Sequence, residues 1–316
     1  MRFLKPKFWD EKKLSLFSII LLPISIIIQI VIFLKENFIE RRYFDVPIIC
    51  IGNIYLGGTG KTPLSIEISK ILKKNKKKPA VIKKFHSNQK DEMNLIKNKS
   101  KSLIVNKNRI SALNDAQLKG FDTMILDDGL QDSSIKADLN IVCFNGNTVD
   151  GNGLTIPSGP LRENLKRLIN CEIVAININN KDKKNLGFEK KIRKINNSLD
   201  IFYTKYFFHR PSIKKIKNKK IFAFAGIGNP ERFFNLLKSY NLKIQKEKYF
   251  PDHYEYSINE LKEMIEYSKK NKLELITTEK DFYRIKKFGL KKINFIPTDF
   301  KIEDEKRFVK ILKRYI

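Results

Sequence analysis

At 316 residues the chain is long enough for two domains that each bury a core of their own. Lys and Arg number 63 against 34 Asp and Glu, so the formal net charge is +29. Such a charge suits nucleic acid or an anionic membrane surface. Because lysine is abundant along the whole chain and no recognised nucleic-acid-binding module accompanies it, we expect no nucleic-acid partner.

The three cysteines, Cys50, Cys143 and Cys171, lie far apart in the sequence, and each stands inside an apolar run. An odd number of scattered cysteines is not typical of a disulfide framework or of a zinc site. We therefore expect reduced cysteines in the core of a protein from a cytosolic compartment.

The segment Leu14–Leu34 contains no charged residue. At about 1.5 Å per residue, a helix of this length is just long enough to cross about 30 Å of hydrocarbon. We expect residues 1–40 to form a helix held at or in a membrane, with the rest of the chain in the cytoplasm. Basic residues flank the segment on both sides, so its orientation stays open. A buried helix packed on the next domain is the alternative.

Residues 48–72 predict a buried strand, a glycine-rich turn and an amphipathic helix, in that order. A polyphosphate needs several backbone N–H donors at close range, which glycine permits, and the positive end of a helix behind them. The predicted nucleotide-binding residues are Gly57, Gly58, Thr59, Gly60, Lys61 and Thr62.

Within this turn, Lys61 would reach the β- and γ-phosphates and the Thr62 hydroxyl would bind Mg²⁺. The match to the phosphate-loop pattern is imperfect, because Tyr55 stands where its first glycine belongs. A glycine turn with a purely structural role is the alternative.

Strands and helices alternate after this turn, which predicts a doubly wound, mostly parallel sheet with ligands at the carboxyl ends of its strands. Asp127 and Asp128 follow one such strand, where carboxylates can hold a nucleotide-bound Mg²⁺. A simple Asp-Asp-Gly turn is the alternative. Asp91 and Glu92 could accept a proton or help to hold the metal, or could be a solvated helix start.

A polar, lysine-rich stretch at residues 212–220 marks the expected domain boundary. We therefore predict a nucleotide-binding core domain over residues 41–212 and a smaller α/β domain over residues 213–316. In the second domain His253 stands beside Asp252, and on the sequence alone it is interpreted as a loop residue.

Six stretches, in this order and spacing, resemble the tetraacyldisaccharide 4'-kinases of lipid A biosynthesis. They are an apolar N-terminal helix, the glycine turn at 52–63, KDE at 90–92, DDGLQ at 127–131, PSGPLRE at 157–163, and FAGIGNPERFF at 224–234 followed by PDH and TTEKD.

The resemblance implies a kinase of the P-loop NTPase type at the cytoplasmic face of the inner membrane, acting as a monomer. It would move the γ-phosphate of ATP, with Mg²⁺, to the 4'-hydroxyl of a tetraacylated glucosamine disaccharide 1-phosphate. The implied base is Asp91 paired with His253, with Lys61 as a further catalytic residue. The implied metal ligands are Thr62, Glu92, Asp127 and Asp128, and the implied substrate residues are Arg109, Gln131, Arg162 and Glu163.

Three loops depart from the family pattern. Residues 83–87 replace a Ser-Arg-Gly-Tyr-Gly-like turn, Lys90 replaces a glycine, and Asp132 replaces a histidine. These changes leave the adenine and substrate contacts open.

A membrane-recruited P-loop switch ATPase is the main alternative function, although Leu56 stands where such switches carry a lysine. A third interpretation, a basic NTPase that binds nucleic acid, would be supported by the net charge alone.

Overall fold

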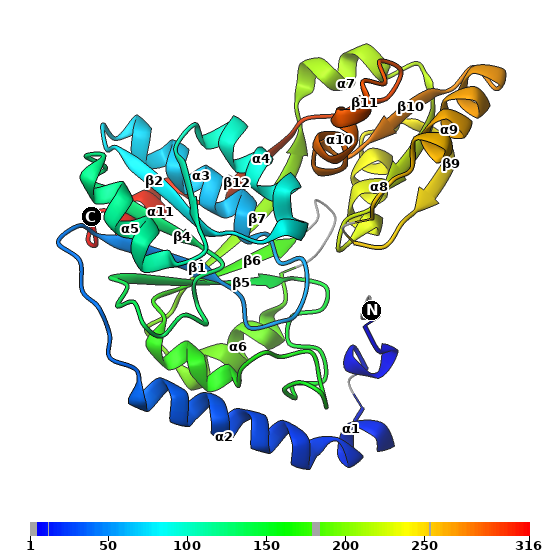
Figure 1. Ribbon diagram of the computed structural model, residues 1–316. Coiled ribbons are helices and arrows are strands. Elements are labelled where there is room, and N and C mark those ends of the chain that lie inside the picture. The colour runs from blue at the N-terminus through cyan, green and yellow to red at the C-terminus, as the bar shows by residue number, and fades with distance from the viewer. Residues whose placement is uncertain (1–4, 12, 179–183, 253) are drawn as a thin grey trace.

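The computed structural model describes residues 5–11, 13–178, 184–252 and 254–316. Two α/β units lie side by side, each built on a sheet of its own, and helix α2 (Leu22–Phe38) runs along the outside of the larger unit (Figure 1). The two sheets agree with the expected fold class of a larger α/β unit and a second, smaller one.

The large sheet has eight strands in the order β12-β7-β6-β5-β1-β4-β2-β3. All neighbours are parallel except β12, which runs antiparallel to β7. The predicted doubly wound, mostly parallel sheet is therefore confirmed. Its strands are β1 (Ile48–Gly52), β2 (Pro79–Lys84), β3 (Leu103–Asn106), β4 (Thr123–Asp127), β5 (Leu139–Asn145), β6 (Ile173–Ile178), β7 (Asp200–Phe208) and β12 (Thr298–Ile302).

Helices cover both faces of this sheet because its strands are apolar on both sides. Ile48 and Cys50 of β1 share one core with α5 and α6, whereas Ile49 and Ile51 share another with α3, α4 and α11. The covering helices are α3 (Lys61–Lys74), η2 (Ser87–Gln89), α4 (Lys90–Ser100), α5 (Arg109–Leu118), η3 (Leu165–Asn170), α6 (Leu186–Ile195) and α11 (Glu305–Leu312).

The smaller sheet has four parallel strands in the order β11-β10-β8-β9. Helices α7 and α8 pack on one face, and α9 and α10 pack on the other over an aromatic core. Its elements are α7 (Arg210–Ile216), β8 (Lys220–Ala225), α8 (Pro230–Ser239), β9 (Lys243–Tyr249), α9 (Ile258–Lys270), β10 (Glu274–Thr277), α10 (Glu279–Ile285), η4 (Lys286–Phe288) and β11 (Asn294–Phe295).

The end of the chain returns to the large sheet. Strand β12 adds to its edge, and Phe300 and Phe308 are buried in the same core as α3. The expected second domain, 213–316, therefore contains a last strand and helix that pack with the first unit. The reason is the apolar face of these two elements, which the large sheet buries.

The N-terminal segment forms η1 (Lys7–Trp9), α1 (Leu16–Ile20) and α2 (Leu22–Phe38), with Pro23 in the first turn of α2. Two helices thus stand where one was expected, because proline has no backbone N–H with which to continue the first. Among the described residues, no helix combines the length and the apolar composition needed to cross a membrane.

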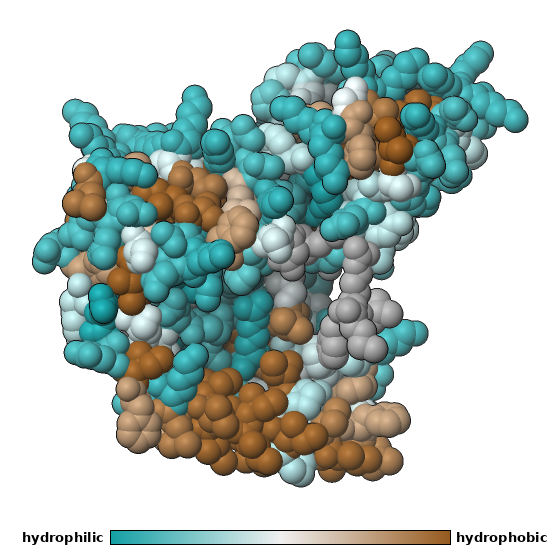
Figure 2. All heavy atoms as spheres, viewed as in Figure 1, coloured by the Kyte–Doolittle hydropathy of each residue, from teal (hydrophilic) through white to brown (hydrophobic). Residues whose placement is uncertain are grey.

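Helix α2 has two contrasting faces. On the inner face, Ser25 is buried, and its Oγ lies 3.0 Å from the carbonyl oxygen of Thr155 and 2.9 Å from Ser158 Oγ. On the outer face, large apolar side chains are exposed and form the continuous brown band of Figure 2. They include Ile24, Ile26, Ile27, Ile30, Val31, Phe33, Leu34 and Phe38.

Candidate active site

The glycine turn joins β1 to α3 at the carboxyl end of the large sheet. Gly57 and Gly60 have φ values of 136° and 96°, which side chains larger than hydrogen rarely adopt. A Cβ on Gly60 would also lie 2.5 Å from Asn177 Nδ2. The backbone of this turn therefore requires glycine at both positions.

The two residues that open α3 face polar partners. Lys61 Nζ lies 3.0 Å from Asn53 Oδ1 and 3.5 Å from Asp128 Oδ1. Thr62 donates its hydroxyl proton to Asp127 Oδ2 at 3.0 Å. The turn, the start of the helix and the predicted acids of β4 thus meet at one place, as the sequence predicts for a phosphate site.

Asp127 is fully buried and is surrounded by donors. Ser65 donates to its Oδ1 at 2.9 Å, and Lys83 Nζ lies 2.7 Å from its Oδ2. The same Lys83 ammonium lies 2.9 Å from Glu92 Oε2. Burial alone would lower the pKa of Lys83, but the charges of Asp127 and Glu92 outweigh it and raise the pKa above its usual value.

Asp128 has a buried carboxylate oxygen that is suited to bind a metal ion. Its Oδ1 is buried and has no hydrogen-bond partner among the described residues, although Lys61 and Arg162 lie within 3.5 Å. Burial raises its pKa, but these cations and Lys83 lower it more, so the carboxyl is ionised at neutral pH. With Thr62 it offers the hard oxygen atoms that Mg²⁺ prefers.

Glu92 has different surroundings from these two acids. One of its oxygens faces Lys83, and the other lies 3.0 Å from Lys280 Nζ of the smaller unit. Burial raises the pKa of Glu92, but the two ammonium groups outweigh it, and the pKa falls well below its usual range. Glu92 thus joins the acids of the large sheet to the smaller unit through ion pairs.

The predicted substrate residues gather around Asp128. Gln131 Nε2 donates to Glu163 Oε1 at 2.9 Å, and Arg162 Nη1 donates to Gln131 Oε1 at 3.3 Å. Arg109 donates to the backbone carbonyl of Asp128 and pairs with Asp132, one of the departures from the family pattern. The structure therefore brings all four predicted residues to one edge of the phosphate site.

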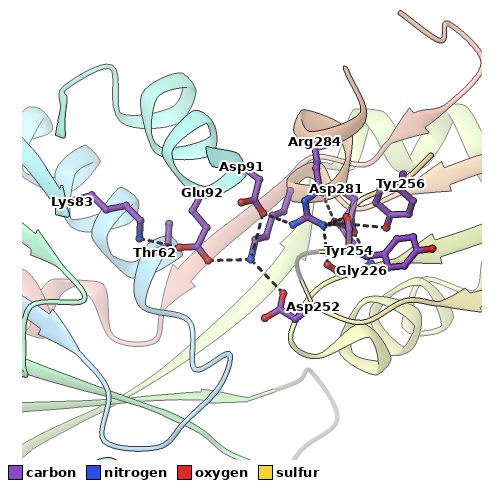
Figure 3. A network of polar contacts seen from close by, with 12 residues as sticks. Thr62, Lys83, Asp91, Glu92, Gly226, Asp252, Tyr254, Tyr256, Asp281 and Arg284 are labelled. Carbon is purple, nitrogen blue, oxygen red and sulfur yellow. Dashed lines mark hydrogen bonds and ion pairs between the residues drawn. The ribbon is translucent and has the colours of Figure 1, made fainter. Parts of the chain in front are cut away.

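Asp91 opens helix α4 and is buried against the smaller unit (Figure 3). Its Oδ2 lies 2.5 Å from Arg284 Nη2 and 3.6 Å from Lys280 Nζ, both from α10. His253, its expected partner, lies outside the described residues.

Sequence reasoning missed three cations of this site: Lys83, Lys280 and Arg284. Lys83 carried a usable signal, because it lies at the carboxyl end of β2, where ligand-facing residues are expected. Lys280 stands in the TTEKD motif, but nothing near Lys280 or Arg284 in the sequence points to Asp91 and Glu92, which belong to a distant part of the chain.

Comparison with known proteins agrees with this geometry. A family model described as tetraacyldisaccharide-1-P 4'-kinase matches residues 17–316. A tetraacyldisaccharide 4'-kinase of Pelagibacter ubique is 43% identical over 315 residues, which cover 99% of this chain and 98% of the relative. One from Rickettsia typhi is 31% identical over 300 residues and covers 90% of each chain.

Among solved structures, the Aquifex aeolicus protein LpxK in complex with ATP has a TM-score of 0.73 with this chain at 21% identity. The match covers 95% of this chain and 99% of that one. The shared fold is that of a P-loop NTPase with a smaller α/β unit. The family match over nearly the whole sequence and the 43% identical relative show that this chain belongs to the tetraacyldisaccharide 4'-kinases, the ATP-dependent kinases of lipid A biosynthesis.

Proposed function

We propose that this chain transfers the γ-phosphate of ATP to the 4'-hydroxyl of a tetraacylated glucosamine disaccharide 1-phosphate. The observation that carries the proposal is the meeting of a glycine turn, two strand-end acids and a group of arginines at one edge of the sheet. Phosphoryl transfer needs alignment and charge neutralisation more than covalent help, and these residues are suited to both.

Thr62, Asp127 and Asp128 are proposed to hold Mg²⁺ with the nucleotide, directly or through water. When bound, the ion would neutralise charge on the phosphates. Lys61 would contact the β- and γ-phosphates. Glu92 supports this site less directly, because Lys83 and Lys280 are its partners. We assign it to the ordering of Lys83 beside Asp127.

Arg109 and Arg162, with Gln131 and Glu163, are proposed to line the path of the acceptor. Both arginines lie beside Asp128, and a guanidinium group suits the recognition of a phosphorylated sugar. Asp91, with His253 as its partner, is proposed to take the proton from the 4'-hydroxyl, which is a poor nucleophile until it is deprotonated.

The outer face of α2 is proposed to enter the cytoplasmic leaflet of the inner membrane, where the lipid acceptor would lie. Large apolar side chains gather along this helix, and its inner face is bonded to the loop that carries Arg162 (Figure 2). We further propose that the protein acts as a monomer, since one chain supplies both the phosphate loop and Asp91.

The experiment is transfer of radiolabelled phosphate from ATP to the tetraacylated disaccharide 1-phosphate in detergent micelles. We expect label in the lipid fraction, and Asp91→Asn should lower kcat by about 100- to 10,000-fold. Because Asp91 does not contact the glycine turn, affinity for ATP should change by less than about 3-fold, a shift of under 1 kcal/mol.

Label that appears only as inorganic phosphate would contradict the kinase and favour the switch ATPase. Loss of ATP binding in Asp91→Asn would instead assign Asp91 to the nucleotide or metal. As a matched control, Asp299→Asn changes an exposed aspartate of β12 and should leave both transfer and ATP binding unchanged.

A further inference from the structure

Helix α10 of the smaller unit lies against α4, the helix that carries Asp91 and Glu92 in its first turn (Figure 3). It begins within the TTEKD motif at 277–281, which the proposed chemistry leaves without a role. Thr278 caps the helix by accepting the N–H of Asp281 at 3.0 Å. The motif thus fixes the start of a helix whose Glu279, Lys280 and Arg284 side chains pair with residues of α4.

Arg284 is held in place by its own unit. Its Nη1 donates to the carbonyl oxygens of Gly226 and Tyr254, each at 3.2 Å, and to Asp281 Oδ1 at 2.9 Å. Asp281 is fully buried and also accepts from Gly226 N, the Thr278 hydroxyl and the Tyr256 hydroxyl. The smaller unit therefore prepares a guanidinium group of fixed orientation.

The second terminal nitrogen of this guanidinium points across to the large unit. Nη2 lies 2.5 Å from Asp91 Oδ2, and the side chains of Arg284 and Asp91 are 13% and 3% exposed. A charge-assisted hydrogen bond between groups so well shielded from water is strong and directional. It holds one carboxylate oxygen of Asp91 in a defined place.

Other ion pairs besides Arg284–Asp91 also hold the two units together. Lys99 of α4 pairs with Glu279 at 2.6 Å, and Lys280 pairs with Glu92 at 3.0 Å. Those pairs already join α4 to α10. Arg284 differs from them because it donates a hydrogen bond at 2.5 Å to the carboxylate proposed as the base, whereas Lys280 lies 3.6 Å from that carboxylate.

We propose that Arg284 is a positioning residue for Asp91. The smaller unit presents its guanidinium to Oδ2, so Asp91 is oriented for proton transfer only while α10 rests on α4. This inference depends on the proposed function, because it assumes that Asp91 acts on the acceptor hydroxyl.

The test compares Arg284→Met and Arg284→Lys in the full chain, assayed for phosphate transfer to the disaccharide acceptor. We expect Arg284→Met to lower kcat by about 10- to 100-fold, the effect of misplacing a reacting group by about 1 Å. KM for ATP should stay within about 3-fold, since Arg284 does not contact the glycine turn. Arg284→Lys keeps the charge without the planar fork and should recover part of kcat.

Arg307→Met is the matched control, because Arg307 also pairs with an aspartate, Asp200, but at the surface of the large unit. Its kcat should equal that of the native chain. A drop in kcat as large as that of Arg284→Met would overturn the inference.

Combination with Asp91→Asn separates positioning from a structural role. If Arg284 acts through Asp91, Asp91→Asn/Arg284→Met should be no slower than Asp91→Asn alone. Multiplied losses, or an unchanged kcat in Arg284→Met, would overturn the inference while the native chain still transfers phosphate. Should Arg284→Met fail to fold in a thermal melt, Arg284→Lys takes its place in the cycle. No transfer by the native chain would instead refute the proposed function.

Discussion

Lys83 and Asp127 are neighbours across two parallel strands, and Nζ of Lys83 lies 2.7 Å from Oδ2 of Asp127. The register of β2 on β4 pairs these two residues directly. Both side chains are buried, and Glu92 adds a second carboxylate 2.9 Å from the same ammonium. The ammonium group of Lys83 therefore neutralises part of the negative charge at the acidic edge of the phosphate site.

Replacement of this cation should be costly for folding. In Lys83→Met the carboxylates of Asp127 and Glu92 lose their shared partner while they stay shielded from water. We expect the free energy of unfolding to fall by about 3–5 kcal/mol, as for other broken buried ion pairs. Urea unfolding followed by circular dichroism measures this change.

Lys219→Met is the control for that measurement, because Lys219 pairs with Glu274 at 2.8 Å but is half exposed. An exposed pair contributes about 0–1 kcal/mol. Equal losses in the two variants would show that burial of Lys83 adds nothing to its contribution.

Gly60 should be intolerant of even one methyl group. Gly60→Ala places a Cβ 2.5 Å from Asn177 Nδ2, at a φ of 96° that already disfavours alanine. The left-handed region costs about 1–2 kcal/mol, and the clash adds to it. We therefore expect affinity for ATP, measured by isothermal titration calorimetry, to fall by at least about 10-fold.

Gly120→Ala supplies the matched backbone change, since Gly120 has a φ of 70° and its Cβ would meet no atom within 4 Å. Because alanine is strained in the left-handed region, Gly120→Ala should lower the free energy of unfolding by a similar amount. It should leave affinity for ATP unchanged. Native affinity in Gly60→Ala would mean that the glycine turn does not need its present shape.

The local parts of the site were predictable from the sequence. An apolar run followed by Asp127 and Asp128 predicts a strand with acids at its end, and β4 has this form. The glycine turn was equally clear, because neighbouring residues alone set the backbone there. Such features depend on periodicity and turn chemistry, which a short window of sequence contains.

The long-range parts were not predictable in this way. Strand order places β4 and β2 side by side, and nothing in the sequence of either strand states that Lys83 will meet Asp127. Arg284 and Asp91 are farther apart still, and they meet only because the two units pack together. The return of β12 to the large sheet was missed for the same reason.

The N-terminal helices pack on the core with one face, and contact of the other face with a membrane stays a prediction. Ser25 and Gln29 of α2 bond to the loop that carries Ser158 and Arg162, as a helix packed on the core would. The opposite face exposes large apolar side chains to the outside, as a helix at a lipid surface would. An amphipathic pattern was hidden in the sequence because uncharged Ser25 and Gln29 supply polar contacts on the inner face of α2, and an ion pair through Glu36 lies at the end of the helix.

The outer face of α2 should control binding to membranes. Ile26, Ile27 and Val31 are 56%, 60% and 58% exposed, and burial of each in lipid contributes about 1.5–3 kcal/mol. Replacement of all three by Asn should lower binding to phosphatidylethanolamine–phosphatidylglycerol vesicles by at least about 100-fold in a flotation assay, without change in the thermal melt. The control changes three exposed apolar residues elsewhere to Asn, namely Leu118, Leu186 and Ile258. Equal flotation of both triple variants, abolished by high salt, would assign binding to the basic surface instead of α2.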